Sequence, residues 1–338
     1  MTRSPASAVR LEAVAAAKSV HQELDLKNRV TTGGGLVDVF AAISELDIPL
    51  VFKPLNSALG LCLPAPLKGI IVTTKRGLHI QRFTAAHELG HVILEHQGSI
   101  DQEILERGPL EPTHGRDLKE VAADAFAAEF VLPRWLYRHH IRAQSWTVAK
   151  DLRDPDVIYQ LSLRMGASYE ATCWGLVGHE ILDQGSVDKL RKATVARLKG
   201  RVGGEFKPAN GWADAWRLTS KDNGSLLYGS PNDLVRIELD EAPGSGYQWQ
   251  IEALSAAGYE ILSDESTFSR TPLLYGAPST RILIARPPER DGLVTLREEN
   301  AWSSPSSEAP SFTIGLRVDG PEPGGISRAE RRRWGIQT

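Results

Sequence analysis

Residues 87–91 form the pattern His-Glu-x-x-His. On a helix, residues four apart project from one face on successive turns, so the imidazoles of His87 and His91 can reach the same Zn²⁺ ion. Glu88 lies about 100° round the helix from His87, where its carboxylate can contact a water molecule on the metal without binding the metal itself. The pattern therefore predicts a hydrolytic zinc site in which Glu88 is the catalytic base.

A third protein ligand has to come from elsewhere, because a catalytic zinc usually has three protein ligands and one open position. Glu95 falls on the face of His87 and His91, but it stands about 12 Å along the helix from His87, too far to share the metal. His96 is rotated away from that face. The better candidate is Glu120, which lies 29 residues beyond His91 in a second helical segment.

Glu120 and Asp124 are four residues apart and share one face of that second helix. The first could bind zinc while the second accepts a proton from a ligand imidazole. Solvated helices also carry such acidic pairs, but two histidines without a third ligand would not make a catalytic site, so we favour the metal interpretation. His114 precedes this helix in a predicted loop, where it is either an oxyanion stabiliser or an ordinary surface histidine.

Local patterns also predict the helices and strands that must position these residues. Thr84 offers a helix N-cap, and residues 85–97 favour a helix. The helix with Glu120 covers about residues 118–131 and stops before Pro133, whose ring and missing N–H suit a helix end. Further helices are predicted at residues 6–26 and 37–45, and strands at residues 50–53 and 67–73.

Two segments resemble the ImmA/IrrE family of bacterial zinc metallopeptidases: residues 81–96, Q-R-F-T-A-A-H-E-L-G-H-V-I-L-E-H, and residues 120–133, E-V-A-A-D-A-F-A-A-E-F-V-L-P. The resemblance extends over roughly residues 10–185. It implies a zincin-type, thermolysin-like core of the gluzincin kind, with Glu88 as catalytic base and with His87, His91 and Glu120 as zinc ligands. Known members cleave helix-turn-helix transcriptional repressors that control mobile-element or stress-response genes, so the resemblance implies such a regulatory protein as substrate.

The region after the two motifs, residues 136–202, reads as a helical extension. Segments 155–165 and 168–179 are joined by Gly166-Ala167 and have the spacing of a helix-turn-helix. The second segment contains no Arg or Lys, whereas a helix that reads DNA normally presents such side chains to phosphates and bases. The sequence therefore favours packing or partner binding over direct DNA binding.

The residue composition and the apolar pattern of the chain change after residue 202. Residues 203–224 are rich in turn-forming residues and read as a linker. Residues 225–320 contain short alternating strands separated by turns, which is typical of an all-β, Ig-like sandwich. Residues 321–338 include four arginines and read as a flexible basic tail.

Residues 239–249, L-D-E-A-P-G-S-G-Y-Q-W, resemble the first binding loop of chagasin-like inhibitors of papain-type cysteine proteases, which have an Ig-like fold. The resemblance covers about residues 225–320. It implies a recognition loop made of Pro243, Gly244, Ser245, Gly246 and Tyr247. Ala242 stands where the family usually has Asn. Tyr247 and Trp249 share one strand face, and both could instead be sandwich core.

Composition limits the class of protein. The chain has 338 residues, with 39 Lys plus Arg against 42 Asp plus Glu, so its formal charge of -3 gives no general attraction to nucleic acid or anionic lipid. Its two cysteines exclude a disulfide framework and a thiolate-rich zinc site, although one reactive thiol stays open. No stretch approaches the roughly 20 apolar residues of a membrane span, and the start lacks the apolar run of a signal peptide. We therefore expect a cytoplasmic protein without membrane contact.

These observations predict a multidomain α+β protein: a metallopeptidase core (1–135), a helical extension (136–202), a linker (203–224), a β-sandwich (225–320) and a tail (321–338). The predicted function is a zinc endopeptidase that cleaves a regulatory protein, with the sandwich recognising substrate or restraining activity. The alternative is a non-catalytic regulator with a structural or degenerate metal site. A third interpretation is a protease inhibitor whose sandwich binds a cysteine protease or another protein, with a vestigial peptidase attached.

Overall fold

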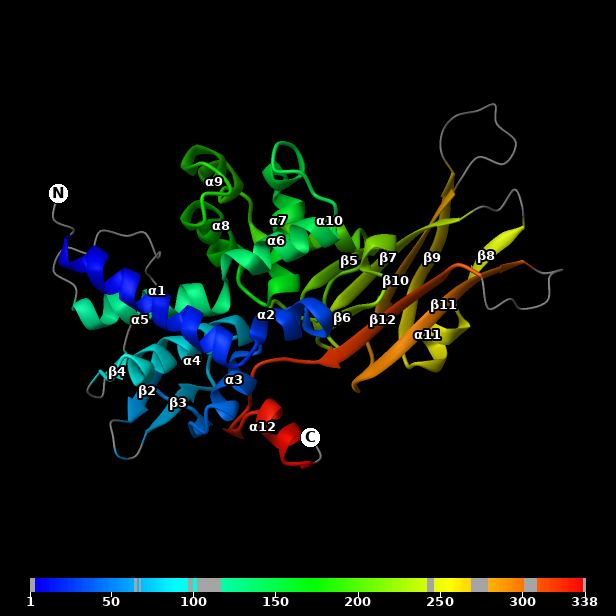
Figure 1. Ribbon diagram of the computed structural model, residues 1–338. Coiled ribbons are helices and arrows are strands. Elements are labelled where there is room, and N and C mark those ends of the chain that lie inside the picture. Colours follow the sequence, from blue (N-terminus) through cyan, green and yellow to red (C-terminus); the bar gives the residue numbers. More distant parts are fainter. Residues whose placement is uncertain are drawn as a thin grey trace. The chain divides into compact units, whose positions relative to one another are not determined.

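The computed structural model describes residues 4–63, 66, 68–96, 100–101, 117–241, 246–268, 279–300 and 309–336 (Figure 1). The chain divides into two compact units. Unit 1 combines Met1–His139, Met165–Asp188 and Gly320–Thr338, and unit 2 combines His140–Arg164 and Lys189–Asp319. The architecture is of the predicted mixed class, with helices and a small sheet in unit 1 and most of the strands towards the C-terminus. The predicted helical extension is therefore divided between the units.

Unit 1 contains a five-stranded sheet in the order β13-β1-β3-β2-β4. Its strands are β1 (Leu50–Lys53), β2 (Gly60–Leu63), β3 (Gly69–Thr73), β4 (Ile100–Asp101) and β13 (Gly325–Ile326). β1 and β3 are parallel, and the other neighbouring strands are antiparallel. The central strand β3 carries Ile70 and Val72, which lie on one face of the sheet and are both buried.

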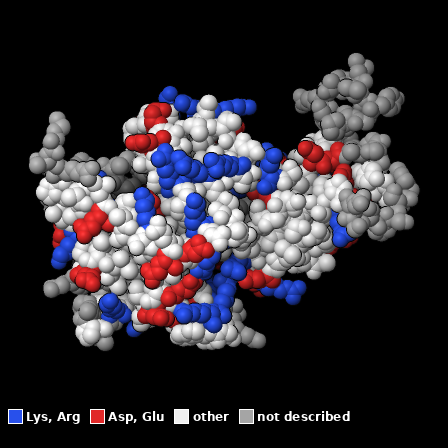
Figure 2. Space-filling view, in the orientation of Figure 1, with Lys and Arg blue, Asp and Glu red and all other residues white. Residues whose placement is uncertain are grey.

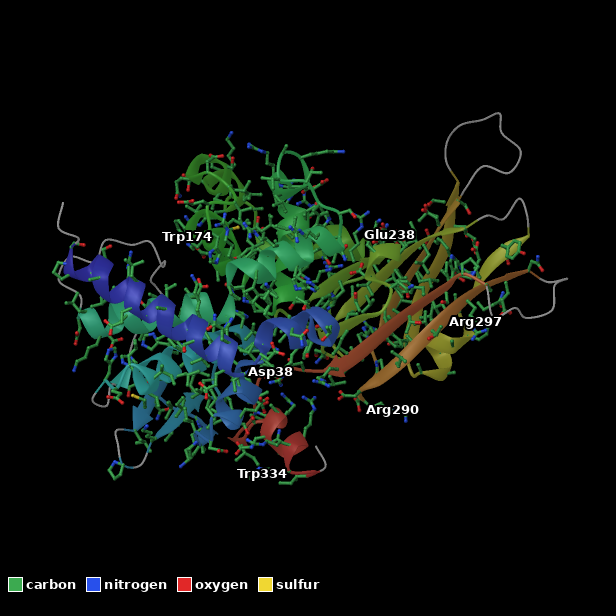
Figure 3. The ribbon with its side chains drawn as sticks, in the orientation of Figure 1. Asp38, Trp174, Glu238, Arg290, Arg297 and Trp334 are labelled. Atoms are coloured by element: carbon green, nitrogen blue, oxygen red, sulfur yellow. The ribbon has the colours of Figure 1, made fainter. Side chains whose placement is uncertain are left out.

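Unit 1 also contains helices, some of which contact this sheet. They are α1 (Pro5–Glu23), α2 (Leu26–Arg29), α3 (Val39–Glu45), α4 (Leu78–Ile93), α5 (Leu118–Val131), the first part of α6 (Arg134–Ala143), α8 (Tyr169–Gly178) and most of α9 (Gln184–Leu190). Residues 30–34 form a short π-helical turn. Asp38 begins α3 by accepting a hydrogen bond from the Ala41 amide, as an N-cap does (Figure 3).

Helix α4 starts earlier than the sequence predicts. Gly77, and not Thr84, is its N-cap, and Thr84 is a fully buried residue in the helix interior. The local capping preference of threonine was overridden because residues 78–83 are held by tertiary contacts. Gln81 donates to the Thr73 carbonyl, and Arg82 donates to the Gly166 carbonyl.

Helices α4 and α5 pack closely because small residues face the contact. A Cβ at Gly90 of α4 would lie 3.1 to 3.2 Å from the side chain of Phe126 on α5. Ala122, Ala123 and Ala127 are buried on α5. This close packing brings the histidine face of α4 next to the first turn of α5, which carries Glu120.

The C-terminal segment is part of unit 1, so the prediction of a flexible tail is wrong for its ordered elements. β13 pairs with the free edge of β1, with Val51 opposite Ile326, and helix α12 (Arg328–Arg333) follows it. Figure 1 shows this red segment beside the blue N-terminal strands. Trp334, labelled in Figure 3, follows the helix and is 59% exposed. The composition of this segment, rich in Gly and Arg, suggested disorder, but the edge of β1 offers β13 a partner for pairing.

Unit 2 contains two four-stranded sheets, in the orders β5-β7-β10-β9 and β6-β12-β11-β8. The first consists of β5 (Ala215–Thr219), β7 (Leu234–Glu241), β10 (Ser279–Arg286) and β9 (Glu260–Phe268). The second consists of β6 (Ser225–Gly229), β12 (Ser311–Val318), β11 (Gly292–Asn300) and β8 (Tyr247–Gln250). Buried Val235, Ile237 and Leu239 alternate along β7, which is the period that predicted a half-buried sheet.

Helices also belong to unit 2: the end of α6, α7 (Pro155–Met165), α10 (Val195–Gly203) and α11 (Glu252–Ala256). Residues 215–219, predicted as part of a linker, form β5 instead, because they pair in parallel with β7. Helices α7 and α8, which have helix-turn-helix spacing, fall in different units.

Acidic and basic side chains lie interspersed on the face shown in Figure 2, in keeping with the small net charge. Within the described ranges, every helix is too short or too polar to cross a membrane.

Candidate metal centre

Two ring nitrogens on α4 point at each other. Nε2 of His87 and Nε2 of His91 are 3.1 Å apart, and both side chains are almost completely buried, at 1% and 0% exposure. The four-residue spacing on one helix produces this geometry. The structure therefore places the two predicted histidine ligands so that both can reach one ion.

Glu120 brings a carboxylate to the same point from α5. Asp117 begins this helix by accepting a hydrogen bond from the Lys119 amide, so Glu120 lies in the first turn. Its Oε2 is 3.3 Å from Nε2 of His87, and its Oε1 is 3.4 Å from Nε2 of His91. One ligand atom from each of the three residues lies within 4.8 Å of the others.

The donor set fits a divalent metal such as zinc. Two imidazole nitrogens and one carboxylate oxygen are a known ligand set for catalytic zinc, which leaves a fourth position open. Two Nε2 atoms 3.1 Å apart would repel each other if both carried protons, whereas a cation between the nitrogens and the carboxylate would satisfy all three groups. The donor set and the spacing of the three groups thus fit a metal ion.

Asp124 lies behind His87, one turn after Glu120. Its Oδ1 is 3.0 Å from Nδ1 of His87. Such a carboxylate keeps the proton of the imidazole on Nδ1 and leaves the Nε2 lone pair for a metal. The structure thereby brings Asp124 to the position that the sequence predicts for it.

The carboxylates make this point of the protein favourable for positive charge. Burial alone would lower the pKa of His87, but hydrogen bonding to Asp124 and Glu120 outweighs burial and raises this pKa to about 10. The hydrogen bonds from His87 and His91 in turn hold the pKa of Glu120 well below its usual value. A site that stabilises a proton in this way also stabilises a metal cation.

Glu88, the predicted base, is fully buried on α4 and lies close to strand β2. A Cβ at Gly60 of β2 would be 2.8 Å from Oε1 of Glu88. Gly60 therefore lets the sheet approach the carboxylate, a role that sequence reasoning missed. Gly60 is the first residue of β2, and a glycine in a strand can mark a close approach, but no strand was predicted at residues 60–63.

His96 also contacts the centre, so the prediction that it is rotated away is wrong. Its Nδ1 is 2.9 Å from Nδ1 of His91. Helix α4 ends at Ile93, and Glu95 has a positive φ of 55°, so the chain turns back before it reaches His96. Burial, and then the nearby His91, lower the pKa of His96 and favour its neutral form. Glu95 is exposed and stands outside the ligand cluster, as predicted from its distance.

The remaining predicted site residues are only partly described. His114, Pro243, Gly244 and Ser245 lie outside the described residues. In unit 2, Tyr247 is 36% exposed, whereas Trp249 is buried and donates its Nε1–H to the Asp240 carbonyl. Trp249 thus belongs to the core of the β-rich region, and Tyr247 stays available at the surface.

One known family matches the region that contains the candidate metal centre. Residues 43–176 match the family model Peptidase_M78, described as the IrrE N-terminal-like domain. This match makes residues 43–176 similar to an ImmA/IrrE-type metallopeptidase domain. The matched segment of this domain contains α4 and α5, and with them His87, Glu88, His91 and Glu120.

Two solved structures are each similar to about a third of the chain. One is the cysteine protease inhibitor EhICP2 from Entamoeba histolytica, at 24% identity and a TM-score of 0.26, covering 31% of this chain and 96% of that chain. The other is Amebosin, at 19% identity and a TM-score of 0.26, covering 30% of this chain and 96% of that chain. No curated protein matches the chain.

Proposed function

We propose that the protein is a zinc-dependent endopeptidase of the ImmA/IrrE type that cleaves a regulatory protein. The observation that supports this most strongly is the convergence of His87, His91 and Glu120, whose ligand atoms lie within 4.8 Å of one another. Asp124 behind His87 adds the supporting acceptor that zinc-binding histidines usually have.

The residues of the site suit peptide hydrolysis. When bound, zinc supplies a Lewis acid that polarises a peptide carbonyl and lowers the pKa of water. Glu88 would take the proton of the attacking water and pass it to the leaving amine. Its complete burial excludes bulk water from the proton transfer. His87 and Asp124 would hold the ligand geometry while Glu88 changes its protonation state.

The proposal also names a class of substrate. We propose a helix-turn-helix transcriptional repressor, because the family resemblance implies this substrate class. Such a substrate places the reaction in the cytoplasm, and its cleavage would relieve repression of mobile-element or stress-response genes. The β-rich unit would then recognise the substrate or restrain activity, with Tyr247 as a surface residue that could contact a protein partner.

The test is incubation of the zinc-loaded full-length protein with a helix-turn-helix repressor encoded beside it. Glu88→Gln is the matched control, since glutamine has the same shape as glutamate and cannot accept the proton. The proposal predicts discrete fragments with the wild-type protein and none with Glu88→Gln, measured by mass spectrometry. Suppose that the protein binds zinc but leaves intact both the repressor and a panel of unfolded proteins. That result would favour the alternative of a non-catalytic regulator.

A further inference from the structure

The two nitrogens of the His91 ring have different neighbours. Nε2 faces the ligand cluster, 3.1 Å from His87 and 3.4 Å from Glu120. Nδ1 faces His96 instead, at 2.9 Å from the Nδ1 of that residue. The two rings meet edge to face, with centroids 5.0 Å apart and an angle of 65° between their planes. A hydrogen bond between the Nδ1 atoms therefore fixes the orientation of the His91 ring.

The chemistry of a ligand imidazole determines the direction of this hydrogen bond. A neutral histidine that offers the Nε2 lone pair to a metal carries its proton on Nδ1. Nδ1 of His91 is therefore the donor, and Nδ1 of His96 must accept. His96 then carries its own proton on Nε2, in the neutral form.

The backbone places the His96 ring by a specific helix ending. The amide of His96 donates to the carbonyl of His91 at 2.9 Å, and the amide of Glu95 donates to the carbonyl of Val92 at 3.3 Å. These two bonds, with Glu95 in the left-handed region, make a Schellman motif. The motif reverses the chain after α4 and returns residue 96 to the ring five positions earlier.

We propose that His96 is a positioning residue for His91, equivalent in role to Asp124 for His87. Each ligand histidine then has its own acceptor at Nδ1: a carboxylate for His87 and a neutral imidazole for His91. The acceptor holds the tautomer and the ring orientation that present Nε2 to the metal. This inference rests on the proposed function, because it assumes that His91 binds the metal.

Two substitutions in the full-length protein distinguish the effect of the His96 ring from the effect of the backbone turn that carries it. His96→Ala keeps the backbone hydrogen bonds of the motif and removes the acceptor. His96→Asn places an amide oxygen where Nδ1 was, so it restores an acceptor at the same distance along the side chain. Glu95→Gly is the matched control, because it changes the same turn and leaves both rings in place.

The measurement is zinc affinity by competition with a chromogenic chelator, without any substrate. We expect His96→Ala to weaken zinc binding about 10- to 100-fold, the usual effect of losing such a partner. His96→Asn should recover affinity to within a few-fold of wild type, and Glu95→Gly should leave it unchanged. The visible spectrum of the Co²⁺-substituted protein should change with His96→Ala and return with His96→Asn, which a purely structural role would not produce.

Three results would overturn the inference. One is wild-type zinc affinity in His96→Ala. Another is equal loss in His96→Ala and His96→Asn, and the third is a fall in the thermal stability of the EDTA-treated His96→Ala protein that accounts for the lost affinity. Wild-type protein that binds no zinc would overturn this inference and the proposed function together. Wild-type protein that binds zinc and cleaves nothing would overturn the function alone, because the affinity series is measured without substrate.

Discussion

Gly60→Ala should disable the base while leaving the metal ligands in place. The added Cβ would lie 2.5 Å from Cγ2 of Thr84, 2.8 Å from Oε1 of Glu88 and 3.0 Å from Cγ of Glu88. Ordinary contacts between such atoms start at about 3.5 Å, so these groups must separate by about 0.5 to 1 Å. Strand β2 cannot simply retreat, because Gly60 pairs with Val72 on one side and with Asp101 on the other.

The size of the effect follows from the crowding. Overpacking a dense region costs about 1 to 3 kcal/mol of folding stability. A misplacement of about 1 Å in a catalytic group can cost about 100-fold in rate, so a shift of the Glu88 carboxylate by most of that distance should reduce kcat/KM about 10- to 100-fold. Converted to an activation free energy, this is about 1.4 to 2.7 kcal/mol. The atoms nearest the new Cβ belong to Thr84 and Glu88, so zinc affinity should stay close to wild type.

Cleavage kinetics and zinc content, both measured on Gly60→Ala, test this reasoning. Gly178→Ala is the matched control, because the new Cβ has nothing within 4 Å at that position of α8. The control should cleave substrate at the wild-type rate. Wild-type kcat/KM in Gly60→Ala would refute the close approach of β2 to Glu88. Loss of zinc from Gly60→Ala would show that the substitution acts on the ligands and not on the base.

Three further predictions concern the surroundings of the site. Asp124→Asn should weaken zinc binding about 10- to 100-fold in a chelator competition, because His87 loses its charged partner. Gln81→Ala should lower the free energy of unfolding by about 1 to 3 kcal/mol in a urea titration, because the buried amide bonds the backbone of Glu322 in the C-terminal segment; unchanged stability would argue against docking of that segment. Burial lowers the pKa of His21 to about 4, partly offset by its bond to the Phe130 carbonyl. Between pH 6.5 and 4 the unfolded chain therefore binds a proton that the folded chain does not, so stability should fall by up to about 3 kcal/mol as the pH decreases, and His21→Gln should flatten that slope in urea titrations at each pH.

Features governed by local spacing were predictable. The i,i+4 relation of His87 and His91 depends only on the helical repeat, and the same relation placed Glu120 and Asp124 on one face of α5. The alternation of apolar residues in residues 234–239 likewise predicted a half-buried strand, and β7 has that burial pattern. The sequence also indicated which two helices had to meet, since the two histidines lie on one helix and the third predicted ligand, Glu120, lies on the other.

Features governed by distant partners were missed. β13 is a strand because the edge of β1, more than 270 residues earlier, offers it hydrogen bonds. The close approach of Gly60 to Glu88 depends on how β2 lies over α4, which no local pattern reveals. His96 was misplaced because a regular helix was extended through Glu95, whereas the left-handed conformation of that residue reverses the chain.

The metal content and cleavage activity of three purified proteins test the central claim most directly. Wild type and Glu88→Gln should each hold about one zinc ion per chain, His91→Ala should hold almost none, and only the wild type should cleave its protein substrate. Elemental analysis and a cleavage assay on the same samples give both quantities. Cleavage by Glu88→Gln, or a full zinc content in His91→Ala, would contradict the account.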